Sequence, residues 1–547
     1  MKTKFILSCV VILSSFWLLG QNNVVNESLI IQKETSVSLP AIFRQYFPAA
    51  SYSSPLSTSY KPIFDLYKIN APTLVNLPRV VATRIEPVSK WIPIRSHNLK
   101  FGVGNLLSST VQYRHTNQLV SGLAMQAGFR HDANRNGPVL KSQSGQSLQV
   151  IDLSLQKESK RLQLAFDTKL DRLGFFYFGR ADSLIQNDPL SIDLEGQNLI
   201  HLQNNLVVSL LQNEKWFVSS EIKHMLTTYI NQDLSENSLY SKSLFSYRWN
   251  PQWSLQQEVD YSWMSQQTAV LSKNMTVLRS GSSISYSHDS WVLNGGLQLF
   301  QIQESEKTSN KTFLTPTFTV KYISNQIGQI ELGLTSSAST NSLGELSQQV
   351  AFLSDSIQLS PSVSTSNWFL MYRNGDGKFS YNVALSYENI DQAAFIRNKN
   401  TDFSALLLVY EKGNTGKFST SIGVDGILSG RFSYNASITY RQFFLDSLEA
   451  AFHIPSFEIK TKIGYNWSEK VESGFQTIIY QDIAIPSYYI QEEAPSVVDV
   501  GIWTHIEVKK NLKAFIEVTN LLNQSNNRYY IYPTRPFLSR IGLIKCF

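Results

Sequence analysis

Hydrophobic and polar residues alternate most regularly in the last stretch of the chain, residues 496–547. Aliphatic side chains, with one threonine at 504, occupy every second position of 498–508, and mostly polar or small residues stand between them. After a tight turn the alternation resumes in 512–519, and the chain ends in a last segment, 537–547, on an aromatic residue. A period of two places one side-chain set on each face of a β-strand. The pattern therefore predicts three consecutive strands with one apolar face each.

The same pattern is repeated from Leu99 onward. Segments of about ten residues alternate in the same way, separated in turn by brief turns and longer polar loops. The most regular segments are 378–388, 431–441 and 457–467. One face of each would suit lipid, with Tyr, Trp and Phe near its ends as an interfacial girdle, and the other face would suit a wet lumen.

The lengths of the connections support this interpretation. Tight connections are expected at 213–215, 250–252, 288–289, 468–470 and 509–511, and longer polar loops at 132–146, 180–197, 225–238, 264–274, 302–313, 482–496 and 523–536. Short and long connections alternate, as periplasmic turns and extracellular loops do in outer-membrane barrels. We therefore predict an all-β fold, a transmembrane antiparallel β-barrel of about 22 strands within a range of about 18 to 24. Residues 338–400 break the rhythm, and their strands are not placed.

A soluble propeller or β-helix is the alternative all-β fold. Either would repeat its motif at a fixed spacing, and the sequence shows no such period. The composition also favours a barrel, because charged residues make up 16% against roughly 25% in soluble domains. Aromatic residues make up 12%, and the mean hydropathy is −0.15. The net charge of +6 comes from scattered basic residues, which does not indicate nucleic-acid binding.

The first residues of the chain resemble a secretory signal. Residues 1–4 are basic, 5–19 are apolar, and cleavage is expected near Gly20. Residues 21–97 contain eight of the chain's 18 prolines, and proline disrupts strand ladders. The sequence thus predicts a signal peptide at 1–20, a Pro-rich irregular segment at 21–97 without a full plug domain, and an outer-membrane barrel at 98–547. Of the two cysteines, only Cys546 lies outside the signal peptide, so no disulfide is expected within the mature chain.

The C-terminus resembles that of TonB-dependent receptors. The resemblance rests on Phe515-Ile516-Glu517-Val518-Thr519-Asn520-Leu521-Leu522-Asn523, on Tyr529-Tyr530-Ile531-Tyr532-Pro533, and on Arg535, Arg540, Gly542 and the terminal Phe547. It implies an outer-membrane barrel that the barrel-assembly machinery recognises through its C-terminal strand. Two positions depart from the family pattern, since Pro533-Thr534-Arg535-Pro536 replaces Pro-Gly-Arg and Lys545 stands where an aromatic residue is common.

A second resemblance covers Val111 to Gly179. Residues 130–137 and the aromatic run 175–178 are similar to plugless, TonB-dependent-receptor-like barrels of the Bacteroidota. Residues 79–86 also resemble a TonB box. A TonB box acts by moving the plug domain that follows it. Because no full plug domain is predicted, the sequence does not support energisation by TonB.

No pattern of catalytic or cofactor-binding residues emerges. Asp132, Asn134, Asn136 and Gly137 match the start of a calcium loop, but its twelfth position is Gln143, and short Asn/Asp/Gly runs are ordinary in loops. The eight histidines form no H-E-x-x-H motif, and the most regular strand places His505 on the lumen face. No G-x-S-x-G motif is present. The sequence therefore predicts no enzyme, no metal site and no cofactor.

Two functions remain open from the sequence. The first is a TonB-receptor-like pore or transporter for a solute, with lumen-facing charges setting selectivity and residues 21–97 acting as a partial constriction. The second is a structural or accessory subunit of an outer-membrane complex, with the long loops binding a partner protein. The resemblance to receptors favours transport, and both functions place the protein in the outer membrane, in contact with lipid.

Overall fold

A computed structural model describes residues 96–547 apart from 121, 140, 160, 180–194, 213–214, 306–309, 325, 376–377, 400–404, 429, 486–495, 526 and 530. The predicted signal peptide and the TonB-box-like segment lie outside the described residues. So does almost all of the Pro-rich segment 21–97.

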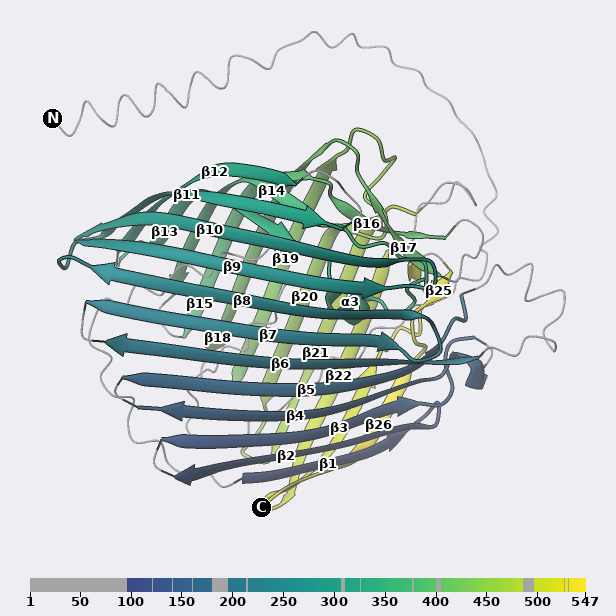
Figure 1. The fold of residues 1–547 in the computed structure, drawn as a ribbon. Coiled ribbons are helices and arrows are strands. Elements are labelled where there is room, and N and C mark those ends of the chain that lie inside the picture. The colour runs from purple at the N-terminus through teal and green to yellow at the C-terminus, as the bar shows by residue number, and fades with distance from the viewer. Residues whose placement is uncertain are drawn as a thin grey trace, which may run out of the picture. The chain divides into compact units, whose positions relative to one another are not determined.

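The described part of the chain forms a closed antiparallel barrel of 22 strands, which confirms the predicted fold class (Figure 1). Its strands are β1 (Ser96–Gly104), β2 (Ser108–Val120), β3 (Leu123–Asn134), β4 (Gln146–Glu158), β5 (Leu162–Phe176), β6 (Gly196–Gln212), β7 (Trp216–Tyr229), β8 (Leu234–Arg248), β9 (Trp253–Gln267), β10 (Ser272–His288), β11 (Trp291–Glu304), β12 (Lys311–Ser324), β13 (Gly328–Ser339), β14 (Ser362–Gly375), β15 (Phe379–Asp391), β18 (Asn414–Leu428), β19 (Phe432–Phe444), β20 (Pro455–Asn466), β21 (Val471–Ile483), β22 (Val497–Lys509), β23 (Leu512–Thr519) and β26 (Leu538–Cys546). Each strand pairs with its neighbour along the chain, and β26 pairs with β1, where Gly542 lies opposite Gly102.

Six smaller elements lie in the connections. They are the 3₁₀ helix η2 (Lys141–Ser144), the helix α3 (Leu343–Gln349), the pair β16 (Ala394–Asn398) and β17 (Leu406–Tyr410), and the short pair β24 (Asn527–Tyr529) and β25 (Tyr532–Pro533). Among the described residues, no helix has the length and apolar character needed to cross a membrane.

The two ends of the barrel differ in their connections, as the sequence predicted. At one end every connection is short, for example 249–252, 289–290 and 510–511. At the other end lie the long ones, including 340–361 and 392–413, and we call this end the outer mouth because long loops face the exterior in such barrels. Two expected loops, 225–238 and 264–274, are largely strand, because β7 to β10 extend past the lipid-facing part and carry side chains that pack inside the mouth.

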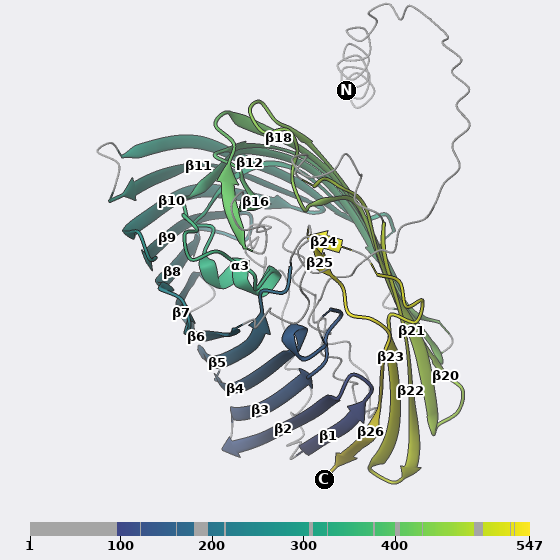
Figure 2. The ribbon, with the colours of Figure 1, turned by 90° about the vertical axis from the view of Figure 1, so that its right-hand side faces the viewer.

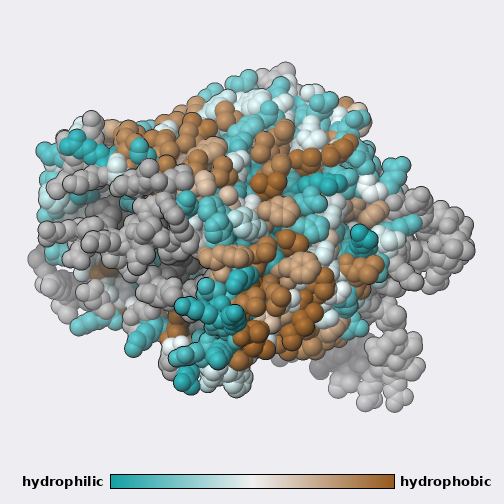
Figure 3. Space-filling view, turned by 90° about the horizontal axis from the view of Figure 1, so that it is seen from below, coloured by the Kyte–Doolittle hydropathy of each residue, from teal (hydrophilic) through white to brown (hydrophobic). Residues whose placement is uncertain are grey.

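The outer surface of the barrel is apolar. Ile502 and Ile506 on β22 are 41% and 40% exposed, whereas His505 on the other face is 7% exposed. Figure 3 shows apolar side chains in brown over the outer surface of the strands. Near the short turns, aromatic side chains pair across neighbouring strands, as in Trp216 with Tyr247 at 4.1 Å between ring centroids and Trp253 with Tyr286 at 4.7 Å.

This arrangement determines where the protein resides. A closed barrel satisfies all backbone hydrogen bonds between strands, and an apolar band with an aromatic girdle matches a lipid bilayer and its interface. The protein is an outer-membrane β-barrel, and the predicted localisation is confirmed.

Candidate functional site

The connection between β13 and β14, residues 340–361, folds into the barrel, and we call it the inner loop (Figure 2). It opens with helix α3, whose N-cap is Ser342, and the Ser342 side chain accepts a hydrogen bond from the Glu345 amide at 3.4 Å. Serine suits this position because its hydroxyl satisfies an amide that has no partner inside the helix. The helix ends at Val350, where the backbone becomes extended and leads into an apolar run.

The inner loop packs into a hydrophobic core that lies inside the outer mouth. We call this core the outer core. The inner loop contributes Leu343, Leu346, Val350, Ala351, Phe352, Leu353, Ile357 and Leu359, the barrel wall contributes Phe175, Leu199, Tyr229, Leu234, Met264 and Met275, and other connections contribute Phe178, Leu406, Leu408, Tyr529 and Tyr532. Phe352 stacks on Tyr532, with 3.7 Å between ring centroids and an interplanar angle of 11°. A barrel lumen is ordinarily polar and wet. Here its outer end is packed like the interior of a soluble protein.

A buried carboxylate on the wall holds the start of the inner loop. Glu236 on β8 is 1% exposed and accepts hydrogen bonds from the Ser342 hydroxyl at 3.0 Å and from the Leu343 amide. These donors lie at the N-terminus of α3, where free amides favour a negative charge. The contact fixes both the position and the direction of the helix inside the barrel.

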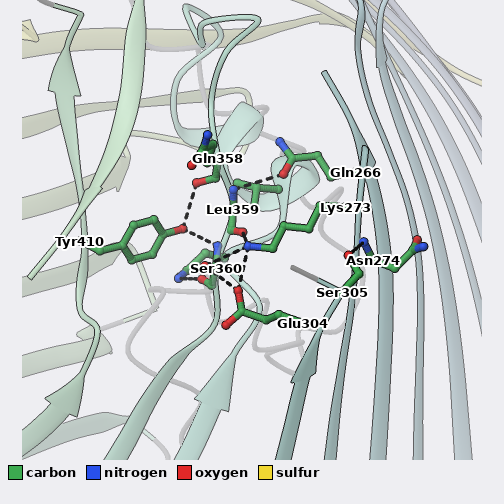
Figure 4. A network of polar contacts seen from close by, with 10 residues as sticks. Gln266, Lys273, Asn274, Glu304, Ser305, Gln358, Leu359, Ser360 and Tyr410 are labelled. Carbon is green, nitrogen blue, oxygen red and sulfur yellow. Dashed lines mark hydrogen bonds and ion pairs between the residues drawn. The ribbon is translucent and has the colours of Figure 1, made fainter. Parts of the chain in front are cut away.

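A second polar contact holds the end of the inner loop (Figure 4). Lys273 on β10 and Glu304 on β11 form a buried ion pair at 2.8 Å. The Lys273 ammonium also donates to the Leu359 carbonyl at 3.1 Å, and the Ser360 hydroxyl donates to Glu304 at 2.9 Å. Because the ion pair is almost fully buried and uses backbone groups of the loop as partners, it ties 359–360 to the wall.

Two further side chains complete this contact in Figure 4. Gln266 on β9 donates to the Ile357 carbonyl at 2.7 Å and accepts from the Leu359 amide at 3.2 Å. On the opposite side of the loop, the Tyr410 hydroxyl accepts from the Ser360 amide at 2.6 Å and donates to the Gln358 carbonyl at 3.2 Å. Paired bonds of this kind satisfy backbone groups that burial would otherwise leave without partners.

The connections on the far side of the mouth meet at a buried histidine. His453, in the connection between β19 and β20, is 3% exposed and lies 3.1 Å from Asn398 Oδ1 through its Nε2. Its backbone amide donates to the Ala484 carbonyl at 2.9 Å, and its ring lies 5.4 Å from that of Tyr529. Burial lowers the pKa of His453 to about 3, so the imidazole is neutral at physiological pH.

Outside the outer core, the lumen face carries charges of both signs. The ion pairs there include Lys100 with Glu517, Lys242 with Glu258, Arg279 with Glu258 and Asp260, Lys417 with Glu388, Arg441 with Glu458, and Arg540 with Asp132. Lumen-facing Lys, Arg and Glu were expected from the alternation. Since each of them is paired with an opposite charge on the same or a nearby strand, this set presents both signs to the lumen rather than one.

The calcium-like run of the sequence does not form a calcium loop. Asp132 and Asn134 lie within β3, and Asp132 pairs with Arg130 and Arg540 instead of facing an open loop. Asn136 and Gly137 follow the strand, and Gln143 lies in η2. In the described ranges, no three His, Cys, Asp or Glu side chains are grouped so as to hold a metal ion. His505 lies on the lumen face, as predicted, 3.8 Å from Glu472.

Sequence reasoning missed the inner loop and the outer core. The available signal was the apolar run 350–353, followed by Ile357 and Leu359, which has neither the period of a strand nor the length of a membrane helix. It fell in the region whose strands could not be placed.

Comparison with known proteins identifies the architecture. No family model matches the sequence, and no curated protein matches it. Among solved structures, the FrpB iron transporter from Neisseria meningitidis (F3-3 variant) is 11% identical and aligns with a TM-score of 0.64 over 83% of this chain and 82% of its own. The siderophore receptor PiuA from Acinetobacter baumannii is 10% identical with a TM-score of 0.61, and the copper transporter OprC is 11% identical with 0.59, each over the same shares.

These similarities show a shared fold. This protein has the same barrel fold as these transporters and receptors, in agreement with the outer-membrane barrel that the C-terminal resemblance implied. The similar structures are transporters and receptors, not enzymes.

Proposed function

We propose that this protein is a receptor-like transporter of the outer membrane whose outer mouth is closed by its own inner loop. The observation that supports this proposal is the outer core, because apolar side chains packed inside one end of a polar lumen obstruct the diffusion of a solute through that end. A scaffold has no need for a polar lumen obstructed in this way. The paired lumen charges would then favour solutes that are neutral overall, since neither sign predominates on the wall.

The proposal assigns a role to the N-terminal segment as well. Strand β1 begins at Ser96, at the barrel end with short turns, which is the periplasmic end, so the barrel is joined to the preceding segment on that side. We propose that residues 21–97 constrict the lumen from that side in place of a full plug, after removal of residues 1–20, and that residues 98–547 are the barrel domain. This makes the protein a plugless, TonB-dependent-receptor-like barrel of the Bacteroidota type, inserted by the barrel-assembly machinery through the strand ending at Phe547.

Single-channel recording of the refolded protein tests the proposal. Four forms are compared: the mature chain, a form with residues 343–359 replaced by a short Gly/Ser linker, a form lacking residues 21–95, and a form with both changes. We expect a silent mature chain, small or brief steps from each single change, and large steady steps from the double change. Deletion of 306–309 controls for the loss of loop residues as such.

The opposite outcome would favour the accessory-subunit function. If all four forms are silent while their bands still migrate as heat-modifiable barrels on gels, the lumen conducts nothing even without its closing segments. Capture of a membrane partner through the long loops would then be the next experiment.

A further inference from the structure

The ladder of backbone pairs between β12 and β13 is interrupted in the wall of the barrel. From the short turn that joins them, these strands pair only as far as Phe318 and Leu334. Beyond that point β12 still pairs with β11 and β13 still pairs with β14, whereas the described residues of β12 and β13 form no further pair with each other. We call residues 311–317 of β12 and 335–339 of β13 the ladder break.

The ladder break lies at the depth of the outer leaflet. Trp291 and Tyr322, with 4.8 Å between their ring centroids, mark the membrane interface next to the short turns. A strand of such a barrel rises about 3.3 Å per residue and is tilted by about 40°, so Pro316 lies about 15 Å above that interface in an apolar band about 25 Å tall. Beside it, Leu314 is 67% exposed on the lipid side. The ladder break therefore occupies the outer half of the band.

Two local features explain why pairing stops here. Pro316 has no amide hydrogen, and proline within a sheet is confined to edges and interruptions for this reason. On β13, the register with β14 shifts between Thr335 and Ser337, and a bulge of this kind bends the strand that carries it. Both features coincide with the point at which β13 leaves β12 and leads into the inner loop. Open strand edges are costly in hydrocarbon, so a wall with a purely structural role would not be expected to contain one.

Side chains bridge the ladder break in the closed barrel. The hydroxyl oxygens of Thr315 and Ser336 lie 2.5 Å apart, and the Ser336 hydroxyl donates to Gln298 Oε1 on β11 at 2.8 Å. Closer to the outer mouth, the Lys311 ammonium lies 3.0 Å from a carboxylate oxygen of Asp391 on β15. A few side-chain contacts hold two segments together less firmly than a continuous backbone ladder does. The ladder break can therefore open while the rest of the barrel stays paired.

The lumen side of the ladder break is apolar. Val277, Ile302 and Val363 form a buried cluster, and Phe313 and Ala338 pack against it. A barrel lumen is ordinarily lined by polar side chains. Here apolar groups lie on both sides of the break, with lipid outside and this cluster inside. A hydrocarbon chain that passed between the two strands would stay in contact with apolar groups along its way.

We propose that the ladder break is a lateral gate through which the hydrocarbon chain of a single-chain amphiphile passes between the lumen and the outer leaflet. The chain would lie between β12 and β13 against the apolar cluster, and the head group would remain on the polar lumen side. Because the outer core obstructs the mouth, this gate supplies another path between the lumen and the exterior. The inference rests on the proposed transport function and specifies its substrate class.

Photolabelling of the refolded mature chain in phospholipid nanodiscs tests the inference. The probe is lysophosphatidylcholine with a diazirine in its acyl chain, and mass spectrometry locates the labelled residues. Leu314 and Phe318 face lipid and should be labelled in every form, which makes them the internal reference. Phe313 and Val363 belong to the lumen side, and we expect them to be labelled because the chain enters the ladder break.

A disulfide across the ladder break should prevent this entry. In a Cys546→Ser background, Thr315→Cys is combined with Ser336→Cys, since hydroxyl oxygens in contact mark positions whose side chains can form a disulfide. Oxidation should abolish labelling on the lumen side while labelling on the lipid side persists, and reduction should restore it. Ser336→Ala alone removes the bridging hydroxyl and should increase labelling on the lumen side. This second variant tests the gate even if the paired cysteines impair folding.

The matched control places a disulfide in an uninterrupted ladder. Ser220 and Ser243 lie opposite each other on β7 and β8 with their hydroxyl oxygens 3.0 Å apart, and replacing both by cysteine should leave labelling unchanged. Lumen-side labelling that is absent from every form, or equal with the disulfide between positions 315 and 336 formed and reduced, would overturn the inference. Photolabelling does not depend on conduction. A barrel that conducts after loop removal but fails this test refutes the gate alone, whereas disulfide-dependent labelling of a barrel that never conducts refutes closure of the mouth by the inner loop and leaves the gate.

Discussion

Replacing Phe352 by alanine should loosen the inner loop while leaving the barrel closed on itself. Phe352 is 4% exposed, stacks on Tyr532, and makes edge contacts with Phe175 at 5.7 Å and Phe178 at 5.6 Å. Truncating a buried Phe to Ala costs about 3–5 kcal/mol. The strand ladders do not involve this side chain, so the loss applies to the docking of the inner loop and not to the barrel.

Native-state hydrogen exchange measures this loss directly. The amide of Val350 donates to the Leu346 carbonyl at 2.9 Å, and it exchanges only when α3 opens. A loss of about 3 kcal/mol corresponds to an opening that is about a hundredfold more frequent. Mass spectrometry of peptides spanning 343–353 should therefore show about a hundredfold faster exchange in Phe352→Ala than in the wild type.

The matched control removes a phenylalanine from the lipid-facing side. Phe318 on β12 is 46% exposed on the outer face, and Phe318→Ala should leave exchange in 343–353 within about twofold, since lipid replaces the lost contacts. Unchanged exchange of α3 in Phe352→Ala would refute the idea that the outer core holds the loop. Equally faster exchange in β7 to β10 would refute the separation of loop and barrel into independently opening units.

Other changes test the polar contacts of the mouth. Glu304→Gln removes the carboxylate 2.8 Å from the buried Lys273 ammonium. Leaving this charge without its partner should cost about 3–5 kcal/mol of docking free energy of the inner loop and appear as channel openings absent from the wild type. The double change Lys273→Met with Glu304→Met removes both charges and should restore much of the closure. Ser342→Ala removes the N-cap of α3 and should speed its exchange about fivefold, for a loss of about 1 kcal/mol. Burial holds the pKa of His453 at about 3 against an ordinary 6.5. When the connection 445–454 that carries His453 is released from its packing, its imidazole therefore binds a proton that the packed state excludes. Docking of this connection should be complete above about pH 6.5 and should weaken as the pH falls from there toward 3. His453→Gln should reduce this pH dependence, measured as amide hydrogen exchange in 445–454.

The strands were predictable because each has a lipid face. Ile502 and Ile506 face the hydrocarbon of the membrane. Because every second residue of a strand lies on this face, apolar residues recur in the sequence with a period of two. The same requirement fixes the alternation of short and long connections. The lumen face has no such constraint, so a partner for a lumen-facing apolar residue such as Tyr229 or Met264 cannot be read from the strand that carries it.

The inner loop was not predictable for a related reason. Phe352, Leu353 and Leu359 are buried by contacts with segments far away in the sequence, and a run of this kind has no period that distinguishes a folded loop from a strand. Trp503 is a further exception to the alternation. It is an aromatic residue at a position of β22 that the period of two assigns to the lumen, between Gly501 and His505, and the period alone does not say which residues it packs against.

The polar contacts that hold the inner loop come mainly from one side of the barrel wall, β8 to β11, and β20 to β22 face them across the lumen in both ribbon views (Figures 1 and 2). Because the strand ladder of β20 to β22 does not include the inner loop, release of the loop should leave these strands intact. Phe352→Ala should therefore speed exchange in α3 without changing exchange in β20 to β22. Faster exchange in those strands as well would mean that docking of the inner loop stabilises the wall on both sides of the lumen.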